Sequence, residues 1–213
     1  MNMLSLDINI INPALHEREF VYIGDFGTGQ PNTILPRFMQ ITEWRDYLLS
    51  LKIQSNKVPL VHVDAFHAAL RMMLLAWVEP MVIQPAELQA LRSLESALIG
   101  PYYEEALVLA KEKNPKLKRE KFKPSLGKLL DYAVEYDQLD AMLHSVRKKE
   151  NGNALSVIRN ALAHGDLFNT LPWCGLFEAV KAVMEHAHRN SSIDTSVPMP
   201  SYLLPEPPSL DLL

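Results

Sequence analysis

The sequence has a single cysteine among its 213 residues, Cys174, so no disulfide can form within one chain. One unpaired cysteine is typical of proteins in a reducing cytoplasm, and we expect the protein there. The 21 basic and 25 acidic residues give a net charge of −4, which provides no general attraction to nucleic acid. Contacts with RNA would therefore have to come from local clusters of positive charge.

Long apolar runs and targeting signals are also missing. The most apolar stretch is interrupted by Pro80 and Pro85, and no segment is long enough to cross a membrane. The amino terminus has no basic stretch followed by an apolar one, so we expect neither a signal peptide nor a membrane partner. His186 and His188 are two apart on an expected helix and point to different sides, so we expect no metal and no other cofactor.

The first 40 residues are β-rich rather than helical. Residues 7–11 and 19–23 carry many β-branched and aromatic side chains, and a turn-rich loop follows the second run. We expect a short strand pair or an extended arm here, and then a short helix capped by Thr42. These segments predict a small amino-terminal extension over residues 1–58.

Residues 59–190 have the periodicity of an all-α bundle, with a four-helix core and additional helices. Apolar residues recur three and four positions apart, and prolines, glycines and polar caps separate the segments. The segment after Ser125 is either one long helix through Val146 or two helices broken near Tyr136–Asp137. The other expected helices are 64–78, 85–98 with a bend or end at Gly100–Pro101, 102–113, 153–164, and a last one starting at Thr170 or Leu171 with Pro172 in its first turn.

The composition changes after Asn190. Residues 191–213 contain five prolines and few residues that could form a core. We therefore expect an extended, proline-rich carboxy-terminal tail.

The most informative segment is the helix expected over residues 153–164. Asn153 is a suitable N-cap, because its side-chain oxygen can accept a free backbone N–H. Gly165 stands where a helix ends on a left-handed residue. Helical spacing also predicts a buried apolar stripe, formed by Leu155, Ile158 and Leu162.

Three polar residues interrupt this apolar helix. Asn160 and His164 are four apart and share a face, whereas Arg159 is turned by about 140° from His164 and reaches the same groove only along its long side chain. Buried arginine and histidine are costly unless they are paired. One interpretation is a structural network, in which Arg159 pairs with a carboxylate such as Glu95 and His164 caps carbonyls. The other is a site at a groove or a subunit interface.

The hexapeptide Arg159–His164 resembles the Arg-polar-x-x-x-His motif of the HEPN superfamily (higher eukaryotes and prokaryotes nucleotide-binding domains). Its context, residues 158–166, is similar to the family's IRN-x-x-AHGD pattern. Residues 125–133 resemble the LGxLI helix found upstream in many members, and residues 94–98 resemble an earlier LExxL helix. The resemblance covers roughly residues 62–190.

Members of this superfamily are all-α bundles, usually dimeric, and many are metal-independent ribonucleases of toxin–antitoxin, abortive-infection and CRISPR systems. The resemblance implies an HEPN-like homodimer that cleaves RNA in a toxin–antitoxin or phage-defence setting, with an antitoxin or another protein as a candidate partner. His164 would transfer protons, Arg159 would bind phosphate, and Asn160 would orient His164 or bind phosphate. Glu95 and Asp166 would support these residues.

Asp166 stands at a position where one group of these toxins has another residue. They carry, two residues after the histidine, a tyrosine that a partner nucleotidyltransferase modifies, so the resemblance does not extend to that modification. Asp166 could instead pair with His164 or cap the next turn. Because fold resemblance does not carry chemistry, the alternative is a non-catalytic HEPN-like module, in which Arg159 and His164 hold the bundle together.

A basic segment lies near the middle of the chain. Residues 111–123 carry seven basic and two acidic side chains. Such runs are most often solvated loops or helix ends. If RNA binds, this segment is the best local source of phosphate contacts without base specificity, and the candidates are Lys116, Lys118, Arg119 and Lys121.

Overall fold

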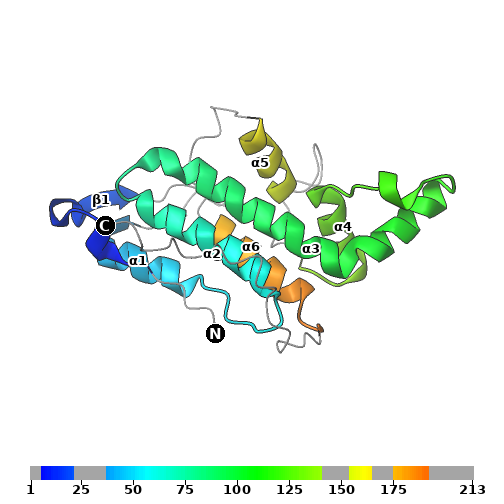
Figure 1. Ribbon diagram of the computed structural model, residues 1–213, viewed down its shortest axis with the longest axis horizontal. Helices are drawn as coiled ribbons and strands as arrows, with labels where there is room; N and C mark the ends of the chain where they lie inside the picture. Colours follow the sequence, from blue (N-terminus) through cyan, green and yellow to red (C-terminus); the bar gives the residue numbers. More distant parts are fainter. Residues whose placement is uncertain (1–5, 22–36, 141–153, 165–174, 192–213) are drawn as a thin grey trace, which may run out of the picture.

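The computed structural model describes residues 6–21, 37–140, 154–164 and 175–191 (Figure 1). Over these residues the chain is mostly helical, with one two-stranded sheet. The strands are β1 (Glu17–Val21) and β2 (Arg37–Gln40). The helices are α1 (Ile41–Ser50), α2 (Leu60–Leu75), α3 (Ile83–Lys113), α4 (Leu126–Tyr136), α5 (Ala154–Ala163) and α6 (Leu176–Ala187), with 3₁₀ turns at Ile8–Ile10, Pro13–Leu15, Pro80–Val82 and Arg119–Lys121.

Helix α3 is the spine of the bundle. It packs along α2 and also contacts α4, α5 and α6, while α1 lies against α2 and β2 (Figure 1). The sheet pairs β1 and β2 antiparallel, with Phe20 opposite Phe38, at the end of the bundle away from α4. The prediction of a mainly helical fold is confirmed. Of the two alternatives for the amino-terminal segment, a strand pair or an extended arm, the structure shows a strand pair, whose second strand is Arg37–Gln40.

The amino-terminal segment shares its hydrophobic core with the helices. The ring of Phe20 lies 4.9 Å from that of Trp44 and 5.7 Å from that of Trp77, and all three side chains are buried. The indole N–H of Trp77 donates to the carbonyl of Leu15 at 2.6 Å, and Arg18 donates to the carbonyl of Trp77 at 2.7 Å. Burying these rings and satisfying their polar groups anchors the arm to α1 and α2.

The expectation of a strand at residues 7–11 is wrong. This segment contains a 3₁₀ turn at Ile8–Ile10. The carboxylate of Asp7 accepts the backbone N–H of Asn9 at 2.9 Å, and this local bond favours a turn over strand pairing. The β-rich run at residues 19–23 contributes its first part to β1.

The first two helices begin at other residues than expected. Helix α1 follows Gln40, not a Thr42 cap, because the carboxylate of Glu43 accepts the backbone N–H groups of Met39 and Gln40 at 2.9 and 3.2 Å. Helix α2 begins at Leu60, directly after Pro59 and four residues before the expected start.

Helix α3 does not end at Gly100–Pro101. Proline has no N–H, so Pro101 cannot donate to the carbonyl of Ala97 one turn earlier. The ring Nε2 of His188 lies 3.0 Å from that carbonyl oxygen and supplies the missing donor, although it is 91 residues away in sequence. A buried histidine thus satisfies the carbonyl that the proline leaves free, and the helix continues to Lys113.

The predicted break near Tyr136–Asp137 is confirmed. Helix α4 ends at Tyr136, and Gln138 has a φ of 57°, a left-handed conformation that no helix continues through. A single long helix through Val146 is therefore excluded; residues 141–153, with the expected cap Asn153, lie outside the described part. Helix α6 follows Gly175, with φ 89°. Its expected start at Thr170 or Leu171, the glycine at 165 and nearly all of the predicted tail likewise lie outside the described residues.

Candidate functional site

Helix α5, which carries the motif, is fixed by its apolar stripe and by one glycine. Leu155 and Ile158 are buried and Leu162 packs against the same core, as predicted. On α4, Gly127 lets α5 come close, since a Cβ at this position would lie 3.0 Å from the Oγ of Ser156. A side chain at residue 127 would therefore require the Ser156 side chain on α5 to shift.

The opposite face of α5 is exposed. Val157, Asn160 and His164 are three and four residues apart, which places them on this face, and Val157 is 43% exposed. The backbone N–H of His164 donates to the carbonyl of Asn160 at 3.0 Å, so His164 continues the last turn. Within the described part of the chain, the imidazole forms no hydrogen bond or ion pair. The side chain is exposed, and no described residue occupies its ring nitrogens.

Arg159 is anchored by a carboxylate on α3. Its Nε and one terminal nitrogen donate to the same oxygen of Glu95 at 3.2 and 2.7 Å, and the other terminal nitrogen donates to the Asn160 amide oxygen at 3.2 Å. The side chains of Arg159 and Glu95 are 31% and 22% exposed. The pairing of Glu95 with Arg159 is as the sequence suggested, and it leaves two of the five guanidinium N–H groups free.

The structure thus brings together three of the five predicted catalytic and supporting residues. Glu95, Arg159 and Asn160 form a continuous chain of hydrogen bonds from α3 to the surface of α5. His164 lies one turn beyond Asn160 on the exposed face, without a contact to the guanidinium. Asp166 is outside the described residues, and so is any contact that it makes with His164.

The basic segment forms the turn between α3 and α4. The side chains of Lys116, Lys118, Arg119 and Lys121 are all exposed, and the segment is attached to α3 by the buried rings and aliphatic groups of Leu107 and Phe122. Arg119 is the one among these four that is held in place. It pairs with Glu104, and its guanidinium lies 5.6 Å from the centre of the Tyr103 ring. The three lysines therefore remain open to solvent.

The sequence did not reveal a second arginine–histidine cluster, at the end of α6. Asp137 accepts from the two terminal nitrogens of Arg189 at 2.6 and 2.7 Å and from the hydroxyl of Tyr102 at 2.6 Å. The ring Nε2 of His186 lies 2.9 Å from the Asp137 carbonyl and 3.4 Å from its carboxylate. The hydrogen bonds from Arg189 hold the pKa of Asp137 below its usual value, and burial raises the pKa of Tyr102.

The sequence contained only one signal for this cluster, the helix break at Tyr136–Asp137. The partners of Asp137 lie 35 to 52 residues away, so no local pattern connects them. The carboxylate of Asp137, the hydroxyl of Tyr102 and the terminal nitrogens of Arg189 all have partners within the monomer. We therefore regard it as a structural clamp that joins the ends of α4 and α6 to the middle of α3.

Comparison with protein-family models, with curated proteins and with solved structures gives no match to this chain. In the described ranges, no three histidine, cysteine or carboxylate side chains are grouped as metal ligands. No helix in those ranges combines the length and the apolarity needed to cross a bilayer. The function proposed below therefore depends on the motif residues and on the geometry of α5.

Proposed function

We propose that the protein is a metal-independent endoribonuclease of the HEPN type that acts as a homodimer. The observation that carries this proposal is the contrast within α5 between a guanidinium held in place by Glu95 and an imidazole, His164, that is open to solvent. A structural pair would use both residues inside the monomer. A site for a charged ligand needs one fixed cation and one accessible group that transfers protons.

The chemistry that suits these residues is transesterification of RNA. The 2′-oxygen attacks phosphorus while His164 accepts its proton, and the bond from phosphorus to the 5′-oxygen breaks. The leaving oxygen takes a proton from a second imidazole, and the products are a 2′,3′-cyclic phosphate and a 5′-hydroxyl end. Imidazole suits both steps because its charge changes near neutral pH. The free N–H groups of Arg159 would bind the phosphate oxygens as negative charge builds up on them.

A two-fold dimer would supply the second imidazole. If two copies of the exposed α5 face meet around a two-fold axis, each contributes Arg159, Asn160 and His164 to one groove. The exposed side chain of Val157 would be covered by the same contact. The groove would then hold two guanidinium groups and two imidazoles. Because each guanidinium is paired with a Glu95 carboxylate, its remaining N–H donors, rather than a net positive charge, would contact the phosphate.

The test is RNA cleavage by the purified full-length protein in the presence of EDTA. We expect cleavage that leaves a 2′,3′-cyclic phosphate, and a loss of at least about a hundredfold in the Arg159→Ala and His164→Ala variants. Arg71→Ala, which removes an exposed arginine from α2, serves as a control and should cleave normally. Cleavage that EDTA abolishes, or that both motif variants retain, would contradict the proposal.

A toxin or phage-defence role is the biological setting that this activity suits. Expression of the wild-type chain in bacteria should then slow growth and degrade cellular RNA, whereas His164→Ala should not. Equal growth of cells that express the two proteins at the same level would count against a toxin role.

The second candidate is a non-catalytic HEPN-like module, and the Arg159–Glu95 pair favours it. Both partners belong to one monomer and are largely shielded, as a bracing contact requires. On this alternative, Arg159→Ala lowers the melting temperature and the wild-type protein cleaves no RNA under any condition. An unchanged melting curve together with lost cleavage would exclude it.

A further inference from the structure

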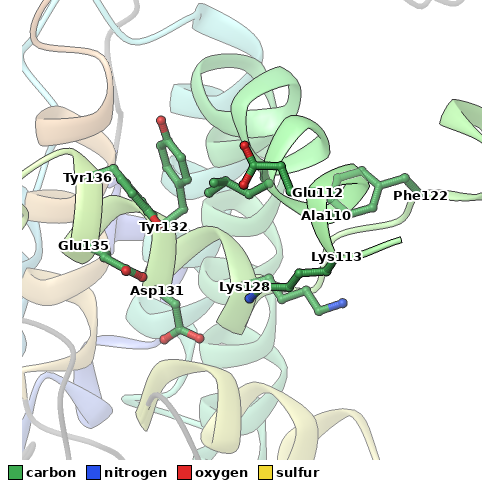
Figure 2. Close-up of a pocket in the computed structure, with 11 residues that line it drawn as sticks. Ala110, Glu112, Lys113, Phe122, Lys128, Asp131, Tyr132, Glu135 and Tyr136 are labelled. Carbon is green, nitrogen blue, oxygen red and sulfur yellow. The ribbon is translucent and has the colours of Figure 1, made fainter. Parts of the chain in front are cut away.

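A groove lies between the carboxy-terminal half of α3 and helix α4 (Figure 2). It has a volume of about 380 Å³, within the range of small-molecule sites. Ala106, Ala110 and the ring of Phe122 form its apolar part, and α4 contributes Tyr132 and Tyr136. The groove is therefore large enough for one nucleotide and offers it aromatic surface.

The two tyrosines of α4 are stacked. Their ring centres are 5.0 Å apart with 27° between the planes, and the ring of Tyr102 backs Tyr132 at 5.4 Å. Tyr136 is the outermost ring of the three and is 52% exposed. A nucleobase can extend such a stack, and a single base–aromatic contact contributes substantially to the binding of single-stranded nucleic acid.

Two lysines and three carboxylates line the groove, and Asp131 lies one turn from Lys128 on α4, on the lysine side (Figure 2). Lys113 and Lys128 lie toward the end away from the tyrosines, and neither forms an ion pair within the described residues (Figure 2). Glu135 and Glu112 lie nearer the tyrosine ring; after desolvation, they are the causes that raise the pKa of Tyr136. A ligand that fits this arrangement carries an anionic group at one end and N–H donors with an aromatic surface at the other.

We propose that this groove binds one nucleotide of single-stranded RNA whose base carries an amino group, guanine above all. The base would stack on Tyr136 and donate from its Watson–Crick edge to Glu112, and the phosphate would lie between Lys113 and Lys128. Uracil, which has carbonyl oxygens at most of those positions, would be disfavoured by the carboxylate. A cationic peptide could use the tyrosines and Glu112 but would be repelled by the two lysines.

The groove and the motif helix are neighbours. Gly127, which precedes Lys128, is the residue against which Ser156 of α5 packs. An RNA strand bound across α5 could therefore continue past the start of α4 into the groove. This inference rests on the proposed function, because its ligand is the RNA substrate, and it places a base-selective contact outside the cleavage site.

The test is binding of short fluorescent RNAs to the full-length His164→Ala protein, followed by fluorescence anisotropy at constant ionic strength. We expect a guanine-rich RNA to bind more tightly than an all-uridine RNA. In the same background, Tyr136→Ala and Lys113→Ala should each weaken binding of the guanine-rich RNA about tenfold. Tyr136→Ala, which removes the surface that holds the base beside Glu112, should also reduce the preference for guanine, whereas Lys113→Ala should weaken binding of both RNAs alike. Tyr136→Phe, which keeps the stack, and Lys111→Ala, which removes a lysine from the same helix outside the groove, are the matched controls and should bind normally.

Equal binding by the Tyr136→Ala, Lys113→Ala and control proteins would overturn the proposal. A second contrary result is that RNA does not bind, whereas an arginine-rich peptide binds the protein and Tyr136→Ala abolishes that binding. This result would assign the groove to a protein segment. Binding of guanosine 5′-monophosphate alone, without the RNA, would assign it to a free nucleotide. If the groove variants lose RNA binding but the wild-type protein cleaves nothing, the proposed nuclease function fails and the groove remains an RNA site.

Discussion

Two places in this molecule combine an arginine, a histidine and a carboxylate, and they differ in how completely these groups are paired. In the clamp after α6, Arg189 contacts both oxygens of Asp137, and His186 lies 2.9 Å from the Asp137 carbonyl oxygen. On α5, Arg159 contacts one oxygen of Glu95, and the ring of His164 has no partner among the described residues. The clamp is closed, whereas the α5 cluster is open at its histidine.

Comparison of these two clusters shows that residue types alone do not define a site. A fully satisfied cluster stabilises the monomer and has no group left for a ligand. A cluster with a fixed cation and an unpaired imidazole adds little to stability through the imidazole, so its presence requires another explanation. Variants of the two clusters should therefore separate effects on folding from effects on RNA.

The largest effect on stability is expected from Asp137→Ala. The substitution leaves Arg189, Tyr102 and the ring of His186 without their shared partner in a partly buried place. We expect a loss of about 3 kcal/mol and a fall in melting temperature of roughly 6–12 °C, with normal RNA cleavage at low temperature. A cleavage defect in a protein that is still folded would break the division between a structural clamp and a functional cluster.

The same carboxylate predicts a dependence on acid. Because its pKa is lower in the folded than in the unfolded protein, the clamp contributes stability above the unfolded value of about 4. That stability is lost as the pH falls below this value through the folded pKa. The melting temperature of the wild-type protein should therefore fall more steeply below about pH 4 than that of Asp137→Asn, and equal slopes would contradict this assignment.

A medium effect is expected where His188 replaces the missing donor of Pro101. His188→Ala leaves the buried carbonyl of Ala97 without its partner, and we expect a loss of about 2 kcal/mol. Adding Pro101→Ala restores a backbone N–H at position 101, so the double variant should recover about 1 kcal/mol of this loss. Strictly additive free energies of unfolding would show that the two residues do not compensate each other.

A smaller loss of stability is expected from Glu95→Gln than from His188→Ala. The pair with Arg159 is partly exposed and uses one carboxylate oxygen, so its loss should cost about 1 kcal/mol or less. Because Glu95 positions the guanidinium, cleavage should fall by more than the small change in stability explains. If Glu95→Gln destabilises as strongly as Asp137→Ala, the α5 cluster is a clamp as well.

The sequence predicted those parts of the fold that depend on local periodicity. The buried stripe of α5 follows from spacing. The break after Tyr136 and the pairing of Arg159 with Glu95 were each one of two alternatives that the sequence left open, and the structure shows both. The open state of His164 could not be predicted, since the same spacing allows a histidine that caps carbonyls within its own monomer.

The failures have a common physical cause, namely a contact that the local pattern does not contain. Residues 8–10, within the β-rich run, form a 3₁₀ turn and not a strand, because the Asp7 carboxylate accepts the backbone N–H of Asn9. Helix α3 continues through Pro101, and His188, 91 residues after Ala97, donates to the Ala97 carbonyl that the proline leaves without a partner. The groove between α3 and α4 depends on two segments meeting in space. Lys113 belongs to the basic segment 111–123, but the tyrosines and Lys128 did not stand out along the chain.

We propose that His164 acts on a bound ligand and does not stabilise the fold. The direct test is to measure RNA cleavage and thermal unfolding on the same His164→Ala preparation. We expect His164→Ala to have the melting temperature of the wild-type protein and to cleave RNA at least about a hundredfold more slowly, with EDTA present throughout. Wild-type cleavage by this variant, or a fall in melting temperature as large as that of Asp137→Ala, would contradict it.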